Sequence, residues 1–161
     1  MSAETPNPYQ PPKARVEDRE GAAPPPPRPR RVTLGVVLLW ISLGIECLLG
    51  FQIVPGILEE LGDQLDTYIL GIVVVATVVI YGVGAWLILM TALRRNWARI
   101  IYLVLYLLGT PSFLMSIGAA FEESLPVAIG STASNALQVV ALVMLFLPVS
   151  NAWFRWRPGA A

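Results

Sequence analysis

The chain has 161 residues, of which 55% are hydrophobic, with a mean hydropathy of +0.63 and a formal net charge of +0. Soluble domains contain about 45–50% apolar residues. Here the excess is concentrated in long blocks, which excludes an ordinary soluble fold. Histidine is absent, so the commonest general base and metal ligand is missing, and we expect no cofactor and no metal site.

The segment that precedes the first apolar block, residues 1–31, contains nine of the fourteen prolines, including the run 24–27. Such a segment cannot bury enough apolar surface to offset the entropy cost of ordering, so we predict a disordered, proline-rich cytoplasmic tail. One interpretation of residues 24–31 is a polyproline II ligand for a proline-recognising domain. The other is a solvated tail whose arginines hold the first helix at an anionic membrane face, and the sequence favours this one.

The first apolar block, residues 32–54, is long enough to cross a hydrocarbon core of about 30 Å at about 1.5 Å per residue. Pro55 and Gly56 are expected to end this helix. Apolar and acidic residues then alternate at helical spacing, which predicts a short amphipathic helix on the outer face over residues 57–66. The alternative for this connection is a solvated acidic loop.

Three further blocks predict three more spans, over residues 68–93, 97–118 and 127–149. Pro111 has no N–H group and is expected to kink the third span. In the fourth span Ala128, Thr132 and Ala136 recur at four-residue intervals. This pattern of small residues predicts a helix-contact face.

Basic residues determine the predicted orientation. All eleven Lys and Arg lie in the tail, the central turn at 94–99 or the C-terminal segment 150–161, whereas the other two connections are purely acidic. The positive-inside rule therefore places both termini in the cytoplasm. We predict an all-α membrane protein, a four-helix antiparallel transmembrane bundle over residues 32–149, oriented N-in and C-in, with a cytoplasmic interfacial C-terminus. The predicted topology anchors are Arg30, Arg31, Arg94, Arg95, Trp97, Arg99, Trp153, Arg155, Trp156 and Arg157.

Glu46 is the one acidic residue inside a predicted span. An ionisable group that faces lipid costs roughly 2.5 kcal/mol or more, so Glu46 should face the bundle interior. At about 1.5 Å of rise per residue, one polar residue of each other span lies within about a turn of its depth, and Gln138 lies one turn further in. The predicted intramembrane polar layer consists of Glu46, Thr77, Ser112, Asn135 and Gln138.

This layer has two interpretations. In the first, Glu46 titrates within a proton- or cation-coupled binding site. In the second, a neutral Glu46 is hydrogen-bonded to Asn135 or Gln138, a helix–helix contact worth under ~1 to 2 kcal/mol, and the sequence favours this one because such contacts are routine in membranes. No HExxH motif, Ser–His pair or pair of membrane aspartates is present, so we expect no enzymatic activity, and no nucleic-acid partner either.

Several short motifs carry a resemblance. The tail motif at residues 7–12 (NPYQPP), the central turn at 95–99 (RNWAR) and the ending at 148–154 (PVSNAWF) resemble small four-span bacterial inner-membrane proteins of unassigned function. This resemblance implies a bacterial source and the inner membrane, and it carries over no catalytic residue. Glu46 also resembles the essential glutamate in the first span of the small multidrug-resistance transporters. The long tail, the acidic outer connection and the charge bias depart from that family.

The sequence therefore predicts a non-enzymatic structural or accessory component of a bacterial inner membrane. Its expected partners are the lipid bilayer and either a second copy of the chain or another membrane protein. The alternative is a small oligomeric proton- or cation-coupled transporter that uses Glu46.

Overall fold

A computed structural model describes residues 26–61 and 67–156, with the side chains of 26–51 and 68–156. Most of the predicted tail, the connection at 62–66 and Arg157 lie outside the described residues. The described chain is all-helical and has no strand. Its helices are α1 (Arg30–Leu61), α2 (Thr67–Ala92), α3 (Asn96–Glu123), α4 (Leu125–Phe146) and α5 (Pro148–Arg155). The first four are long and apolar enough to cross a membrane, which confirms the predicted four-helix membrane fold.

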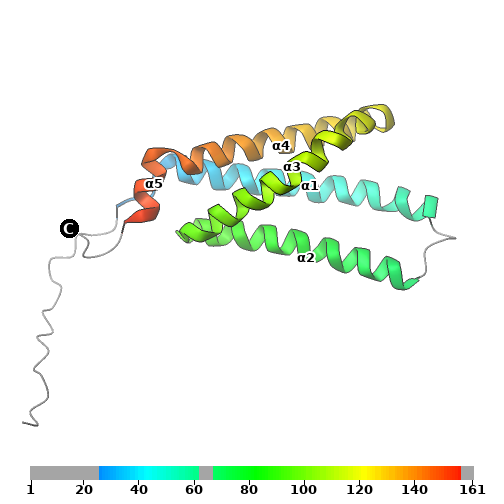
Figure 1. Cartoon of the computed structure of the whole chain (residues 1–161), viewed down its shortest axis with the longest axis horizontal. Coiled ribbons are helices and arrows are strands. Elements are labelled where there is room, and N and C mark those ends of the chain that lie inside the picture. The colour runs from blue at the N-terminus through cyan, green and yellow to red at the C-terminus, as the bar shows by residue number, and fades with distance from the viewer. Residues whose placement is uncertain (1–25, 62–66, 157–161) are drawn as a thin grey trace, which may run out of the picture.

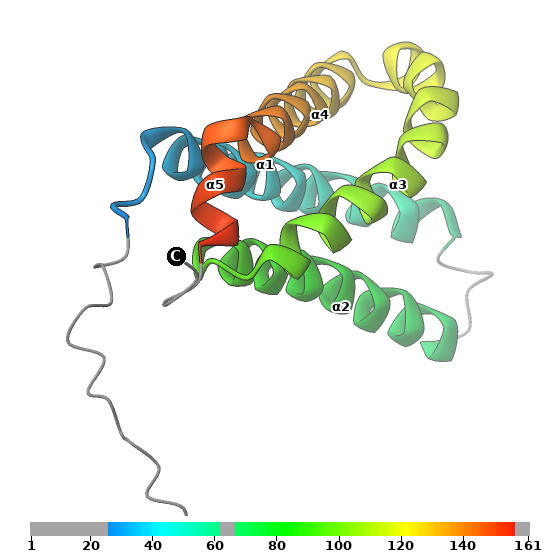
Figure 2. The same ribbon diagram turned by 60° about the vertical axis from the view of Figure 1, so that its left-hand side comes forward.

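The four long helices form a ring. Helix α1 packs on α2, α2 on α3, α3 on α4, and α4 on α1, and this last contact is the most extensive. Figure 1 shows α1 and α4 side by side, α2 on the opposite side, and α3 crossing obliquely between α2 and α4. In Figure 2 the short helix α5 reaches from the end of α4 towards the turn that joins α2 to α3. The ring therefore has one end that α5 covers and one end that it does not.

The first helix is longer than predicted. It continues to Leu61 through Pro55 and Gly56, so the prediction that these two residues end it is wrong. A proline removes one backbone hydrogen bond from a helix. The hydrogen bonds of the neighbouring turns can keep the helix continuous on both sides of the proline. The separate amphipathic helix predicted over 57–66 is thus part of α1 as far as Leu61, and its remaining residues lie outside the described ones.

The fourth predicted span is shorter than 127–149 because the chain turns at Leu147. This residue has an extended backbone (φ −61°, ψ 151°), the conformation favoured before a proline. Pro148 then occupies the first turn of α5, where its missing N–H is not needed. Val149 therefore belongs to a helix that lies across the end of the bundle.

The third helix runs without a break through Pro111 and ends at Glu123, beyond the predicted end at Gly118. Figure 2 shows that α3 changes direction in its second half, the half that contains Pro111. A bend here agrees with the loss of one intrahelical hydrogen bond. It carries the far end of α3 towards α4.

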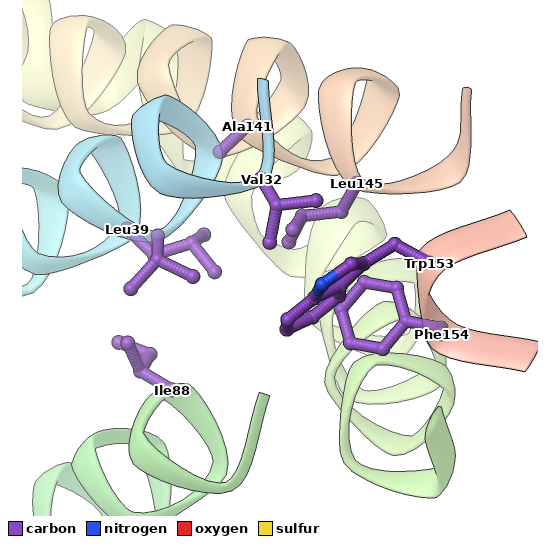
Figure 3. Packing of buried hydrophobic residues seen from close by; sticks show 8 residues of the cluster. Val32, Leu39, Ile88, Ala141, Leu145, Trp153 and Phe154 are labelled. Carbon is purple, nitrogen blue, oxygen red and sulfur yellow. The ribbon is translucent and has the colours of Figure 1, made fainter. Parts of the chain in front are cut away.

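Buried apolar side chains gather at the end of the bundle that α5 covers. Figure 3 shows this cluster, which contains Val32, Val36, Leu39, Ile88, Ala141, Leu145, Trp153 and Phe154. The two aromatic rings come from α5 and meet edge-on, with centroids 4.9 Å apart. Among the described side chains of α1, α2 and α3, all the buried ones lie in the half of each helix nearer to α5. The other half of the ring is more loosely packed.

Helices α1 and α4 approach closely at Gly35. A Cβ atom at this position would lie 3.1 Å from Cγ of Leu145 and 3.2 Å from the carbonyl oxygen of Ala141. Both of these α4 residues are fully buried. A methyl group here would force the neighbouring residues of α4 to shift, so glycine suits this close contact best.

The predicted small-residue face of α4 is not the face that contacts α1. Ala128 is buried, but Thr132 and Ala136 are exposed. Each four-residue step turns a helix about 40° past a full revolution, so two steps rotate a residue away from the starting face. Ser134 and Ala141, seven residues apart, are both fully buried. A seven-residue spacing keeps residues on one face of a packed helix.

We predict that Gly35→Ala lowers the free energy of unfolding in detergent by about 1–2 kcal/mol, because the added methyl group meets a backbone oxygen and a fully buried leucine. Gly44 is the matched control, since it lies in the same helix and a Cβ atom there meets nothing within 4 Å. Gly44→Ala should be neutral or slightly stabilising. Equal effects of the two substitutions on denaturant titrations would contradict the close contact at Gly35.

Candidate functional site

A cavity of about 750 Å³ lies between the four long helices. Its walls are mostly apolar, and Glu46 is the one acidic or basic residue among the described residues that line it. Every helix of the ring contributes at least one hydrogen-bonding side chain to the lining. These side chains are Glu46 from α1, Tyr81 from α2, Tyr102, Tyr106 and Thr110 from α3, and Ser131, Asn135 and Gln138 from α4.

The Glu46 carboxylate is held by α4 through one of its two oxygens. Oε1 accepts a hydrogen bond from the Gln138 side-chain amide at 2.7 Å and another from the Ser134 hydroxyl at 2.9 Å. Oε2 accepts none from the described residues, and no described side-chain polar atom is both fully buried and unpartnered. Glu46 lines the cavity, so the oxygen without a partner among the described residues belongs to a side chain that borders this space.

Ser134 stands between two acceptors. Its hydroxyl lies 2.9 Å from Oε1 of Glu46 and 3.2 Å from the backbone carbonyl oxygen of Ser42. A hydroxyl has a single hydrogen, so these two acceptors share it. The contact ties the middle of α1 to the middle of α4 at a fully buried serine.

Tyrosines complete the walls around Glu46. The Tyr81 hydroxyl donates a hydrogen bond to the backbone carbonyl of Glu46 at 3.1 Å, and it passes over Gly50, where a Cβ atom would lie 3.2 Å from the hydroxyl oxygen. Across the cavity, the Tyr106 hydroxyl donates to Oδ1 of Asn135 at 2.9 Å. The Tyr102 hydroxyl has no hydrogen bond to the described residues. Two tyrosine contacts therefore border the cavity: Tyr81 with the backbone of Glu46, and Tyr106 with the side chain of Asn135.

The structure brings together three of the five residues of the predicted polar layer. Glu46, Asn135 and Gln138 line the cavity, and the predicted bond from Gln138 to Glu46 is present, whereas Asn135 bonds to Tyr106. Thr77 and Ser112 do not belong to the layer: Thr77 donates to the carbonyl of Val73 on its own helix, and Ser112 is exposed. The prediction failed for these two because it used depth alone, which says nothing about the direction a side chain takes from its helix.

Sequence reasoning missed Ser134, Tyr81 and Tyr106. Ser134 lies four residues before Gln138, so it shares that residue's helix face and could have been found from this spacing. The two tyrosines give a weaker signal, because a tyrosine in a span also occurs at the interface. Their hydrogen bonds to α1 and α4 appear only in the folded ring.

A second polar cluster lies at the α5 end and contains four of the predicted topology anchors: Arg94, Arg99, Trp153 and Trp156. Arg99 is almost completely buried, with Nη1 donating to the Leu145 carbonyl at 2.7 Å and Nε donating to Oδ1 of Asn96 at 2.8 Å. Its guanidinium carbon lies 4.2 Å from the ring centroid of Phe154 and 4.9 Å from that of Phe146. This arginine therefore joins α3 to the corner between α4 and α5.

Arg94 joins the same parts from the α2–α3 turn. Its Nε donates to the Trp153 carbonyl at 2.8 Å, and its Nη2 donates to the Trp156 carbonyl at 3.2 Å. The guanidinium carbon also lies 5.1 Å and 4.8 Å from the ring centroids of these two tryptophans. Among the remaining described anchors, Trp97 packs on Trp86 at 5.2 Å. The four remaining anchors whose side chains are described are all exposed: Arg30, Arg31, Arg95 and Arg155.

Comparison with known proteins adds no assignment: no protein-family model matches the chain, and no curated protein or solved structure is significantly similar to it. The two resemblances drawn from short motifs therefore stay predictions. Among the described residues, no group of three or more His, Cys, Asp or Glu side chains could hold a metal ion.

We predict that Ser134→Ala lowers the free energy of unfolding in detergent by about 1 kcal/mol. The substitution removes a buried hydroxyl that bonds to two acceptors on α1, the Ser42 carbonyl and the Glu46 carboxylate. Thr77→Val is the control, since the Thr77 hydroxyl bonds only to its own helix. It should change stability by less than about 0.5 kcal/mol. A larger loss for Thr77→Val than for Ser134→Ala would contradict the placement of both residues.

Proposed function

We propose that this multi-pass protein is a small transporter of a bacterial inner membrane, in which the Glu46 carboxylate binds a proton and a small cation in turn. The observation that carries the proposal is the asymmetry of that carboxylate. Oε1 is fixed by Ser134 and Gln138, while Oε2 has no hydrogen bond to the described residues, and Glu46 lines a cavity of about 750 Å³. A group held in place on one side and unpartnered on the other can exchange a bound cation without moving its helix.

A purely structural role for Glu46 explains less of this arrangement. A glutamine would supply the same carbonyl oxygen to Ser134 and Gln138 without the expense of an ionisable group inside a membrane. A helix–helix contact also needs no cavity beside it, and ligand sites are mostly apolar cavities with a few placed polar groups. The tyrosines Tyr81, Tyr102 and Tyr106 add aromatic walls, and aromatic faces attract cations.

Charge distribution supports the proposed orientation, with both termini in the cytoplasm. All the described arginines belong to the chain before α1, the start of α1, the α2–α3 turn, the start of α3 or α5, and Figure 1 shows these segments at one end of the bundle. Glu122 and Glu123 lie in the last turn of α3, at the opposite end. The arginine end is the cytoplasmic end under the positive-inside rule.

We predict that Glu46→Gln abolishes saturable binding of tetraphenylphosphonium, a lipophilic cation, to the purified protein, because it removes the only charge in the described lining of the cavity. In proteoliposomes the same substitution should abolish proton release on addition of the cation. Glu122→Gln is the matched control, since Glu122 is exposed at the end of α3, and it should leave both signals unchanged. Binding and proton release that survive Glu46→Gln would rule out the proposal.

A second function, that of an accessory component that associates with another membrane protein or a second copy of the chain, is favoured by the outward face of α4. Thr132 and Ala136 are exposed there, and small residues allow two helices to approach closely. This face is compatible with the transporter proposal, because small transporters can be oligomers. It is also the role that the sequence alone favours.

For this second function we expect Ala136→Leu to reduce the fraction of cross-linked dimer formed in native membranes at least about threefold, because the larger side chain separates the helices. Val143→Leu, at another exposed position of α4, is the control and should leave dimer formation unchanged. A dimer fraction that Ala136→Leu does not change would remove this face as an interface.

A further inference from the structure

The end of the cavity nearest α5 is closed by packed side chains. The cavity lining ends at Leu43 on α1, Leu87 on α2, Tyr102 on α3 and Gln138 on α4. Beyond these residues, towards α5, lies the buried apolar cluster that includes Leu39, Ile88 and Leu145. A solute at Glu46 therefore has no path through this end, whereas the opposite half of the ring has almost no buried side chains.

Helix α5 supplies part of this closure. Trp153 and Phe154 are buried, and Figure 3 shows both rings pointing from α5 into the space beside Val32 and Leu145. The opposite face of α5 is exposed at Val149, Ala152 and Arg155. The helix thus acts as an amphipathic cover whose aromatic side plugs the end of the bundle.

Polar contacts hold α5 to the ring in addition to its two buried aromatic rings. Arg94 holds the carbonyls of Trp153 and Trp156, and Arg99 holds the carbonyl of Leu145 and stacks on Phe154. On the other side α5 follows α4 after the single extended residue Leu147, and two of its side chains bond back to α4: Ser150 Oγ donates to the Met144 carbonyl at 2.7 Å and Asn151 Nδ2 donates to the Phe146 carbonyl at 2.9 Å. These bonds to α4 lie next to the bend at Leu147, whereas the polar contacts of α5 with the α2–α3 turn and with α3 come from the two arginines. Loss of the arginine contacts would therefore leave α5 attached at one corner, which is the arrangement of a hinged element.

Arg94 occupies a backbone position that normally belongs to glycine. Its φ is 68°, and it is the only non-glycine residue with positive φ in the described chain. The N–H of Arg95 bonds to the Met90 carbonyl, and the N–H of Arg94 bonds to the Thr91 carbonyl. This is the Schellman pattern at a helix C-terminus, in which the left-handed residue is usually glycine. An arginine is strained here by roughly 1–2 kcal/mol, and its contacts with α5 offset that strain.

We propose that α5 is the cytoplasmic gate of the Glu46 cavity and that Arg94 and Arg99 form its latch, an inference that rests on the proposed transport function. A transporter must expose its site to each side of the membrane in turn, and the closed layer at the α5 end is what has to open. Release of the latch lets α5 swing about Leu147 and withdraws the Trp153 and Phe154 rings from the plug. The path to Glu46 from the cytoplasm then opens.

The substitution Arg94→Gly tests the latch contacts without disturbing the turn in which Arg94 lies. It removes both hydrogen bonds and both ring contacts to α5, yet glycine is the residue that the backbone at this position prefers. The α2–α3 turn should therefore stay intact. Arg95→Ala is the matched control, since it removes an exposed arginine from the same α2–α3 turn.

The measurement is the labelling rate of a reporter cysteine by a membrane-impermeant maleimide in proteoliposomes. The reporter replaces Leu39, which lies in the closed layer facing Ile88 in Figure 3, in a protein whose own Cys47 is changed to alanine. A separate protein with cysteine at exposed position 155 identifies the orientation in which α5 faces the reagent. We expect Arg94→Gly to raise labelling at position 39 from the α5 side by about tenfold or more, since the closed state loses two bonds from a charged donor. Arg95→Ala should leave the rate unchanged.

A second reporter distinguishes opening of a gate from loosening of the whole bundle. Ala128 is fully buried at the other end of α4, far from α5. A cysteine there should stay protected in Arg94→Gly. If labelling does not rise at position 39, or rises equally at both positions, α5 is not a gate. Tetraphenylphosphonium binding in Glu46→Gln tests the transport function separately, so a failed gate and a failed transport function give different results.

Discussion

The contact between α1 and α4 is the interaction on which the rest of the ring depends. It is the most extensive helix pair, and it combines the close approach at Gly35 with the hydrogen bonds from Ser134 and Gln138 to Glu46. In a membrane the apolar surfaces of helices gain little by leaving lipid, so close packing and polar contacts determine which helices pair. Helices α2 and α3 then pack on this pair at its two edges and leave the cavity between them.

This arrangement makes the two ends of the ring unlike each other. At the α5 end, every long helix contributes to a dense apolar layer, and two arginines tie the turn and corner together. At the other end none of the described side chains of α2 and α3 is buried. Loosely packed parts of a protein open at lower free energy than its core. The ring is therefore expected to open more readily at the end away from α5 than at the α5 end.

The sequence was sufficient for the class of fold and for the number of long helices, because long apolar blocks have few alternatives. It also identified Glu46 and Gln138, since polar residues inside spans are rare. It could not give the rotation of each helix about its axis, which is why Thr77 and Ser112 were wrongly included and Ser134 was missed. Helix ends were less predictable as well, because a proline such as Pro55 can be held within a helix by its neighbouring turns.

The arginines of the central turn show most clearly what a sequence pattern leaves out. Charge counting treats Arg94, Arg95 and Arg99 as three equivalent anchors, yet only Arg95 is exposed. Arg99 is buried among aromatic rings and carbonyl oxygens, and Arg94 takes a glycine-like backbone conformation to reach α5. Arginine suits both positions because its planar guanidinium can bond carbonyls at its edge while its face lies on a ring. The same charge pattern that orients a membrane protein thus also supplies the contacts that close one end of it.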